Sequence, residues 1–205
     1  MVETQIFYTN LAEIVSKLGC EDIKLKKLLL KSLGYENVSN GEATRWIEGV
    51  DLLIDKSSLE TSASQIAFNM LPKALNMPAF SQFAEWSDDI YFELAEAIKN
   101  LGGNEKLIGY LKMIYYGRRV DKTDLGVDVY INNESANRLA SDQFNDIPHH
   151  TFLSLDEAMD LNNLLEEFQI DNIDNDELKE FVSEELKPAL EKAKELGKGM
   201  LVTAE

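Results

Sequence analysis

The chain has 205 residues, of which 44% are hydrophobic and 28% are charged, so it can bury a core without a disulfide or a structural metal. Its 37 acidic residues outnumber 20 basic ones, and the net charge of −17 excludes a protein whose main task is to bind nucleic-acid phosphates. The single cysteine excludes an internal disulfide and is one thiolate short of a two-cysteine zinc site.

The first 120 residues predict one short strand followed by six helices. The strand covers Gln5–Tyr8, and the helices cover about 11–18, 21–33, 42–54, a segment capped by Ser62, a segment from Ser87 to Leu101, and one from Asn104 to Tyr116. Pro72 should kink or end the fourth helix. The helix over 21–33 is expected to bury five apolar residues and to expose its lysines. The buried set is Ile23, Leu25, Leu28, Leu29 and Leu33, and the exposed set is Lys24, Lys26, Lys27 and Lys31. The helix over 42–54 should bury Trp46, Ile47, Val50, Leu53 and Ile54.

The remaining residues predict strands around two acidic helices. Strands are expected at Val127–Ile131, His149–Leu153 and Met200–Thr203, and a short helix before Ala140. Ser154 and Glu157 form a capping-box pattern, and Asp174 should open the last long helix, which Pro188 either kinks or divides. We therefore predict one mostly helical α+β domain over residues 1–205, with paired terminal strands in a small sheet and an acidic helical part over 154–198.

The negative charge is concentrated in the second part of the chain. Residues 1–120 hold 16 acids and 13 bases, whereas residues 121–205 hold 21 acids and 7 bases. The predicted helices after Ser154 can present an acidic face, made of Asp156, Glu157, Asp160, Glu166, Glu167, Glu177, Glu180, Glu184 and Glu185. Such a face can simply aid solubility. Because like charges three and four residues apart repel each other, a compensating basic protein partner is the functional alternative.

Tyr115–Arg119 ends in two adjacent arginines after a predicted helix. Arg118 and Arg119 after a helix can complement its dipole or pair with the acidic part of the chain. Alternatively, they can clamp a small anion, with Asp121 or Asp124 as a base, in an enzyme or a ligand-binding protein.

The other candidates for chemistry have simpler structural interpretations. His149 and His150 are adjacent on a predicted strand and cannot readily chelate one ion together. Cys20 sits at a helix junction, and no sequence feature brings a histidine to it. The run Asp171–Glu177 fails the calcium-loop pattern in both reading frames, so a polar turn before a capped helix explains it. We predict no catalytic residue, no metal and no cofactor.

Several segments resemble the bacterial YfbM-like family of proteins of unknown function. They are Tyr8-Thr9-Asn10-Leu11, Leu111–Arg118, Leu153–Ala158, Leu186–Leu190 and Gly197–Val202. The resemblance spans both ends and the centre, about half of the chain, while Gly41–Glu85 has no counterpart. It implies an α+β domain of bacterial or phage-like origin with no established activity, and no functional residues to carry over.

Together these features favour a non-enzymatic cytoplasmic binding protein, of the immunity-protein or phage-inhibitor type, over an enzyme. Its partner would be a basic toxin or nucleic-acid-binding protein. The first residues lack a signal-peptide pattern, and no stretch reaches the roughly 18 apolar residues that a spanning helix needs. We therefore expect no membrane or direct nucleic-acid binding. A structural homo-oligomer is disfavoured because the charge makes copies repel each other, so a monomer is expected in isolation.

Overall fold

A five-stranded sheet forms the centre of the protein. The computed structural model describes residues 4–35, 41–58, 61–80, 89–116, 118–120, 129–131 and 149–204. The strands are β1 (Thr4–Thr9), β2 (Arg118–Val120), β3 (Val129–Ile131), β4 (His149–Leu153) and β5 (Gly199–Ala204), in the order β1-β5-β4-β2-β3. All neighbours are antiparallel except β4 and β2. The predicted pairing of the terminal strands is confirmed, with Ile6 opposite Val202.

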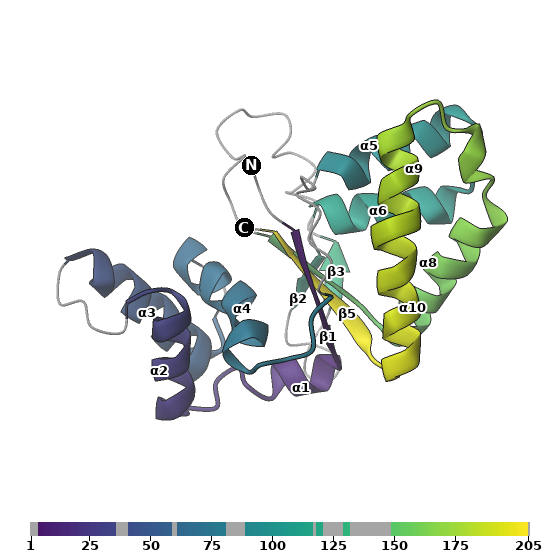
Figure 1. The fold of residues 1–205 in the computed structure, drawn as a ribbon. Coiled ribbons are helices and arrows are strands. Elements are labelled where there is room, and N and C mark those ends of the chain that lie inside the picture. Colours follow the sequence, from purple (N-terminus) through teal and green to yellow (C-terminus); the bar gives the residue numbers. More distant parts are fainter. Residues whose placement is uncertain are drawn as a thin grey trace.

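Helices cover both faces of this sheet (Figure 1). One group comprises α1 (Leu11–Val15), α2 (Ile23–Ser32), α3 (Gly41–Lys56) and α4 (Ser62–Ala74). The other comprises α5 (Asp89–Asn100), α6 (Glu105–Tyr116), α8 (Leu155–Glu167), α9 (Asp176–Glu180) and α10 (Lys187–Leu196). The predicted mostly helical α+β fold is confirmed.

The alternation of strand side chains explains these layers. Successive residues of a strand point to opposite faces, so Phe7 and Leu201 join the core beneath α1–α4, while Tyr8 and Met200 join the core beneath α5–α10. The Tyr8 hydroxyl donates to the carbonyl of Ala189 at 3.1 Å, which ties β1 to α10. Because both faces are buried there, β1 and β5 each contain a continuous apolar run, Ile6–Tyr8 and Met200–Val202.

The outer edge of β1 is covered by the chain segment that follows α4. The Tyr8 amide donates to the Pro78 carbonyl at 2.8 Å, and the Phe80 amide donates to the Ile6 carbonyl at 2.9 Å. These two hydrogen bonds pair backbone groups of β1 that would otherwise form an open edge.

The interior strand β4 is tied to a helix. The Thr151 hydroxyl donates to the Met113 carbonyl of α6 at 2.8 Å.

Most helix starts match the predicted capping residues to within one position. The Ser154–Glu157 capping box forms as predicted. Thr61 rather than Ser62 caps α4, and Asn175 rather than Asp174 caps α9, accepting from the Glu177 amide at 2.9 Å. A neighbouring residue with an equivalent side-chain oxygen serves in both cases.

Three predicted core residues are exposed instead. Ile23 and Leu28 of α2 are 69% and 46% exposed, and Ile47 of α3 is 40% exposed. In α2 only Leu25 and Leu29 are fully buried, because the helix packs against α3 and α4 through a narrow strip. The exposure of Ile23 and Leu28 on α2 is the largest departure from the sequence prediction.

The last long helix is continuous but not uniform. Between α9 and α10 lies a π-helical segment, Phe181–Leu186, and Pro188 sits in the first turn of α10. Proline lacks an amide hydrogen, so the carbonyl four residues before it has no α-helical donor. The division predicted at Pro188 is therefore a change of helix type, not a break. The predicted helix before Ala140 lies outside the described residues, as do Val127 and Asp128 of the predicted strand.

Candidate functional site

The predicted acidic face lies on two neighbouring structural units, α8 and the continuous helix from α9 to α10. α8 packs against α10, and the two run beside each other on the side of the sheet away from α1–α4 (Figure 1). The sequence prediction correctly placed all nine carboxylates on these two units. Their individual environments differ, however, and they divide into three groups and one separate residue, Glu185.

Two carboxylates of α8 are already engaged within the chain. Glu157 accepts from the Ser154 amide at 2.8 Å as part of the capping box. Asp160 pairs with Lys106 of α6 at 2.7 Å, and hydrogen bonds from Lys106 and then Tyr110 lower its pKa. These two residues hold α8 in place through contacts within the chain.

The other α8 carboxylates lie at its two ends. Asp156 is exposed in the first turn, where the helix dipole favours a negative charge. Glu166 and Glu167 are exposed in the last turn, which holds no basic residue, and Glu166 accepts from the Asn162 side-chain amide at 3.1 Å. Negative charge at a helix C-terminus opposes the dipole, so this pair lowers the stability of α8.

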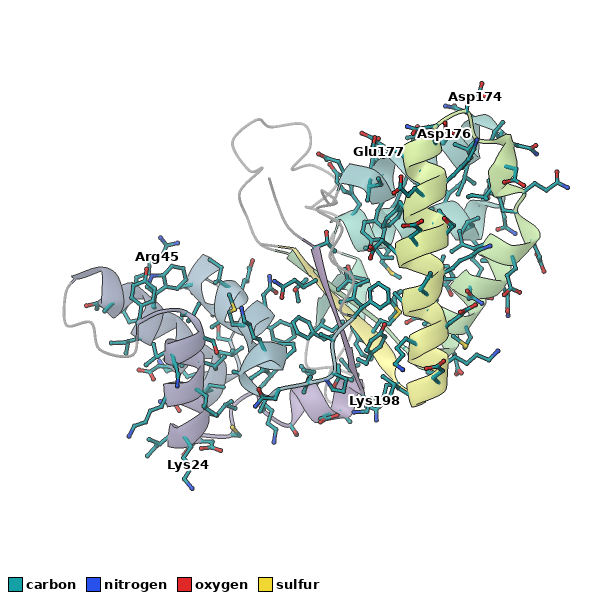
Figure 2. All side chains as sticks on the ribbon, viewed as in Figure 1. Lys24, Arg45, Asp174, Asp176, Glu177 and Lys198 are labelled. Atoms are coloured by element: carbon teal, nitrogen blue, oxygen red, sulfur yellow. The ribbon has the colours of Figure 1, made fainter. Side chains whose placement is uncertain are left out.

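Glu177, Glu180 and Glu184 form a stripe on the last long helix, which we call the glutamate stripe. All three are exposed, and none has an ion-pair partner in the part of the chain that the structure describes. The nearby Lys179 pairs instead with Asp176 at 3.1 Å. The stripe therefore presents uncompensated negative charge, at the end of the molecule where Figure 2 labels Glu177.

Glu185 differs from these three residues because it is only partly exposed. Burial first, and then the charge of Glu185, raise the pKa of the buried Tyr91 hydroxyl. Tyr91 packs edge-on against Phe181, with ring centroids 5.0 Å apart. Glu185 therefore faces the core more than the three residues of the glutamate stripe do.

The loop between α8 and α9 adds acidic side chains that the predicted set omitted. Asp171 and Asp174 are exposed there, beside a short 3-10 turn, Ile170–Asn172. Both residues belong to the acidic run Asp171–Glu177, which the sequence analysis interpreted as a polar turn and not as part of the acidic face. Among the described residues, no group of three or more histidine, cysteine or acidic side chains could hold a metal ion.

The remaining candidates are placed only through their backbones or as isolated residues. Arg118 and Arg119 occupy consecutive positions of β2, and His149 and His150 begin β4 as predicted. The side chains of these four residues lie outside the described part of the structure, so the anion clamp stays a prediction. Cys20 is exposed at the junction before α2.

No family model, curated protein or solved structure matches the chain. The resemblance to the YfbM-like family stays a prediction that rests on the segments quoted for it. Within the described ranges, no helix has the length and apolar character needed to cross a membrane.

Proposed function

We propose that the protein is a non-enzymatic cytoplasmic binding protein whose glutamate stripe docks on a basic protein partner. Glu166, Glu167, Asp171 and Asp174 extend this surface, and the whole region 166–185 carries nine acids and one lysine. The observation that carries the proposal is the exposed stripe of Glu177, Glu180 and Glu184, which has no ion-pair partner among the residues that the structure describes. An immunity protein or a phage inhibitor of a nucleic-acid enzyme has this kind of task.

The energetics of the acidic region support a role in binding. Glu177 and Glu180 are three residues apart, and Glu180 and Glu184 are four apart, so each pair costs the helix about 0.2–0.5 kcal/mol. Glu166 and Glu167 oppose the α8 dipole at a similar cost of about 0.3–1 kcal/mol each. A basic surface that approached these carboxylates would relieve both penalties.

The same charges would act before contact is made. An uncompensated acidic surface attracts a basic protein at long range and raises the rate of association, especially at low ionic strength. A nuclease or nucleic-acid-binding protein must carry lysines and arginines where it holds phosphates. Carboxylates docked on that surface would block access of the nucleic acid, which gives inhibition without any catalytic group.

Affinity capture from a lysate of the source organism tests the proposal. The immobilised protein should retain a basic protein at low salt and release it as the salt concentration rises. The purified partner should lose its nucleic-acid activity when the protein is added. Retention of nothing at either salt concentration, or a partner that is not basic, would overturn the proposal.

A further inference from the structure

The outer face of α2 carries an exposed stripe of positive charge, which we call the lysine stripe. It consists of Lys24, Lys27 and Lys31, all exposed and without an acidic partner among the residues that the structure describes. Lys26 on the same helix differs, because it turns toward α3 and pairs there with Asp51 at 2.7 Å and also with Asp55. Three lysines are therefore directed away from the molecule.

Two aliphatic side chains flank the lysine stripe. Ile23 and Leu28, which the sequence pattern assigned to the core, are 69% and 46% exposed. At 100° per residue, Ile23 lies on one side of the three lysines and Leu28 on the other. An exposed helix face with charge at its centre and apolar groups at its margins is suited to docking on an oppositely charged helix.

The lysine stripe and the glutamate stripe have the same spacing along the sequence. Lys24, Lys27 and Lys31 occupy positions i, i+3 and i+7, and so do Glu177, Glu180 and Glu184. The lysine stripe extends about 10 Å along α2 at 1.5 Å per residue, and the glutamate stripe runs from α9 into the π-helical segment that holds Glu184, where each turn is wider. Lys24 and Glu177 lie at opposite ends of the molecule in Figure 2, so the two stripes of one chain cannot meet.

We propose that a second copy of this chain docks head to tail, with its glutamate stripe on the lysine stripe of the first. The inference rests on the same glutamate stripe as the proposed function, but it needs no foreign partner. The net charge does not prevent the contact, because charges farther away than the Debye length of about 8 Å are screened at physiological salt. Such a contact is heterologous, so both free ends can bind further copies.

Self-association of this kind would regulate the acidic surface. A copy seated on the glutamate stripe covers the carboxylates that a basic partner would use, so the partner must displace it. Both of these oppositely charged, exposed stripes belong to this chain, which favours a second copy over a foreign acidic protein or an anionic lipid surface as the occupant of α2. Three exposed ion pairs and two aliphatic groups make a weak contact, which would form only at high protein concentration.

Sedimentation velocity at protein concentrations up to about 1 mM tests the inference. The average mass of the wild-type protein should rise above that of the 23.2 kDa chain with concentration, and should fall back at high salt. Lys24→Gln, Lys27→Gln and Lys31→Gln together should weaken association about tenfold, and so should Glu177→Gln, Glu180→Gln and Glu184→Gln together.

Sedimentation velocity of a mixture of the two triple variants is the decisive experiment. Each lacks one stripe and keeps the other, so the mixture should form one-to-one pairs although neither variant associates strongly alone. A wild-type protein that stays monomeric at every concentration, or triple variants that associate as strongly as the wild type, would overturn the inference. So would a monomeric protein whose lysine stripe binds phosphatidylserine vesicles, because that assigns α2 to a lipid surface.

The lysine variant also separates this inference from the proposed function. It retains the glutamate stripe, so it should still capture the basic partner, and more strongly than the wild type does at high protein concentration. If the wild-type protein captures a basic partner but does not self-associate, only the proposed docking of a second copy is overturned. If it self-associates but captures no basic partner, only the proposed function is overturned.

Discussion

Glu180→Gln should make the protein more stable, because it removes repulsion that the free chain does not compensate. Glu180 lies three residues after Glu177 and four before Glu184, and all three are exposed. Relief of two like-charge pairs at about 0.2–0.5 kcal/mol each gives a gain of about 0.4–1 kcal/mol in the free energy of unfolding. Glu180 is the fifth residue of a helix that begins at Asp176, so it lies just past the first turn, within which the favourable effect of the helix dipole on a carboxylate falls off.

Thermal unfolding followed by circular dichroism measures this gain. For a chain of this length the gain corresponds to a rise in Tm of about 1–4 °C at low salt. The rise should largely vanish at 1 M salt, where the Debye length falls to about 3 Å. The control is Glu48→Gln, since Glu48 is exposed on α3 between Arg45 and Asp51 and should leave Tm nearly unchanged. An unchanged or lowered Tm for Glu180→Gln at low salt would refute the reasoning.

Three further comparisons test the packing and the internal ion pairs. Gly49→Ala would place a methyl group 2.7 Å from the α4 backbone and should destabilise the protein by about 1–3 kcal/mol, whereas Gly109→Ala meets nothing within 4 Å and should stabilise it by about 0.5–1 kcal/mol. Thr151→Val should cost about 0.5–1.5 kcal/mol, while Thr203→Val, which removes a buried hydroxyl with no hydrogen-bond partner in the described part of the chain, should stabilise by about 1 kcal/mol. Denaturant unfolding should give changes in the free energy of unfolding of opposite sign for the two glycine variants, and likewise for the two threonine variants. Lys112 lies 2.6 Å from the Glu96 carboxylate and lowers its pKa. The ion pair therefore stabilises the fold at neutral pH, and this stabilisation is lost as the pH falls through the lowered pKa. Glu96→Gln should be less stable than the wild type at pH 7 and should approach the wild-type stability in acid.

Local signals predicted the elements and the outline of the fold well. The short strands around Tyr8 and Val202 and the Ser154–Glu157 capping box depend on a few neighbouring residues, so they can be predicted from sequence. The pairing of the terminal strands followed from their placement at the two ends of one cooperative unit. The shift of a cap by one residue arises where two neighbouring polar side chains can each serve.

Tertiary packing decided what the sequence pattern could not. Ile23 and Leu28 fit an amphipathic pattern, yet α2 needs only Leu25 and Leu29 to fill its contact with α3 and α4. The ion pair that engages Asp160 depends on a lysine more than 50 residues away in sequence. The positions of the lysines can be read from the sequence, but only the structure shows that the lysine stripe and the glutamate stripe are both exposed and lie at opposite ends of the molecule.

Binding of the captured partner by matched triple variants tests the central claim most directly. Glu177→Gln, Glu180→Gln and Glu184→Gln together remove three charges from the glutamate stripe. The control triple, made of Glu21→Gln, Glu48→Gln and Glu93→Gln, removes three exposed charges from other surfaces. The account predicts that the stripe variant loses most of its affinity and its dependence on salt, while the control triple binds like the wild type. Equal affinities for the two variants would contradict it.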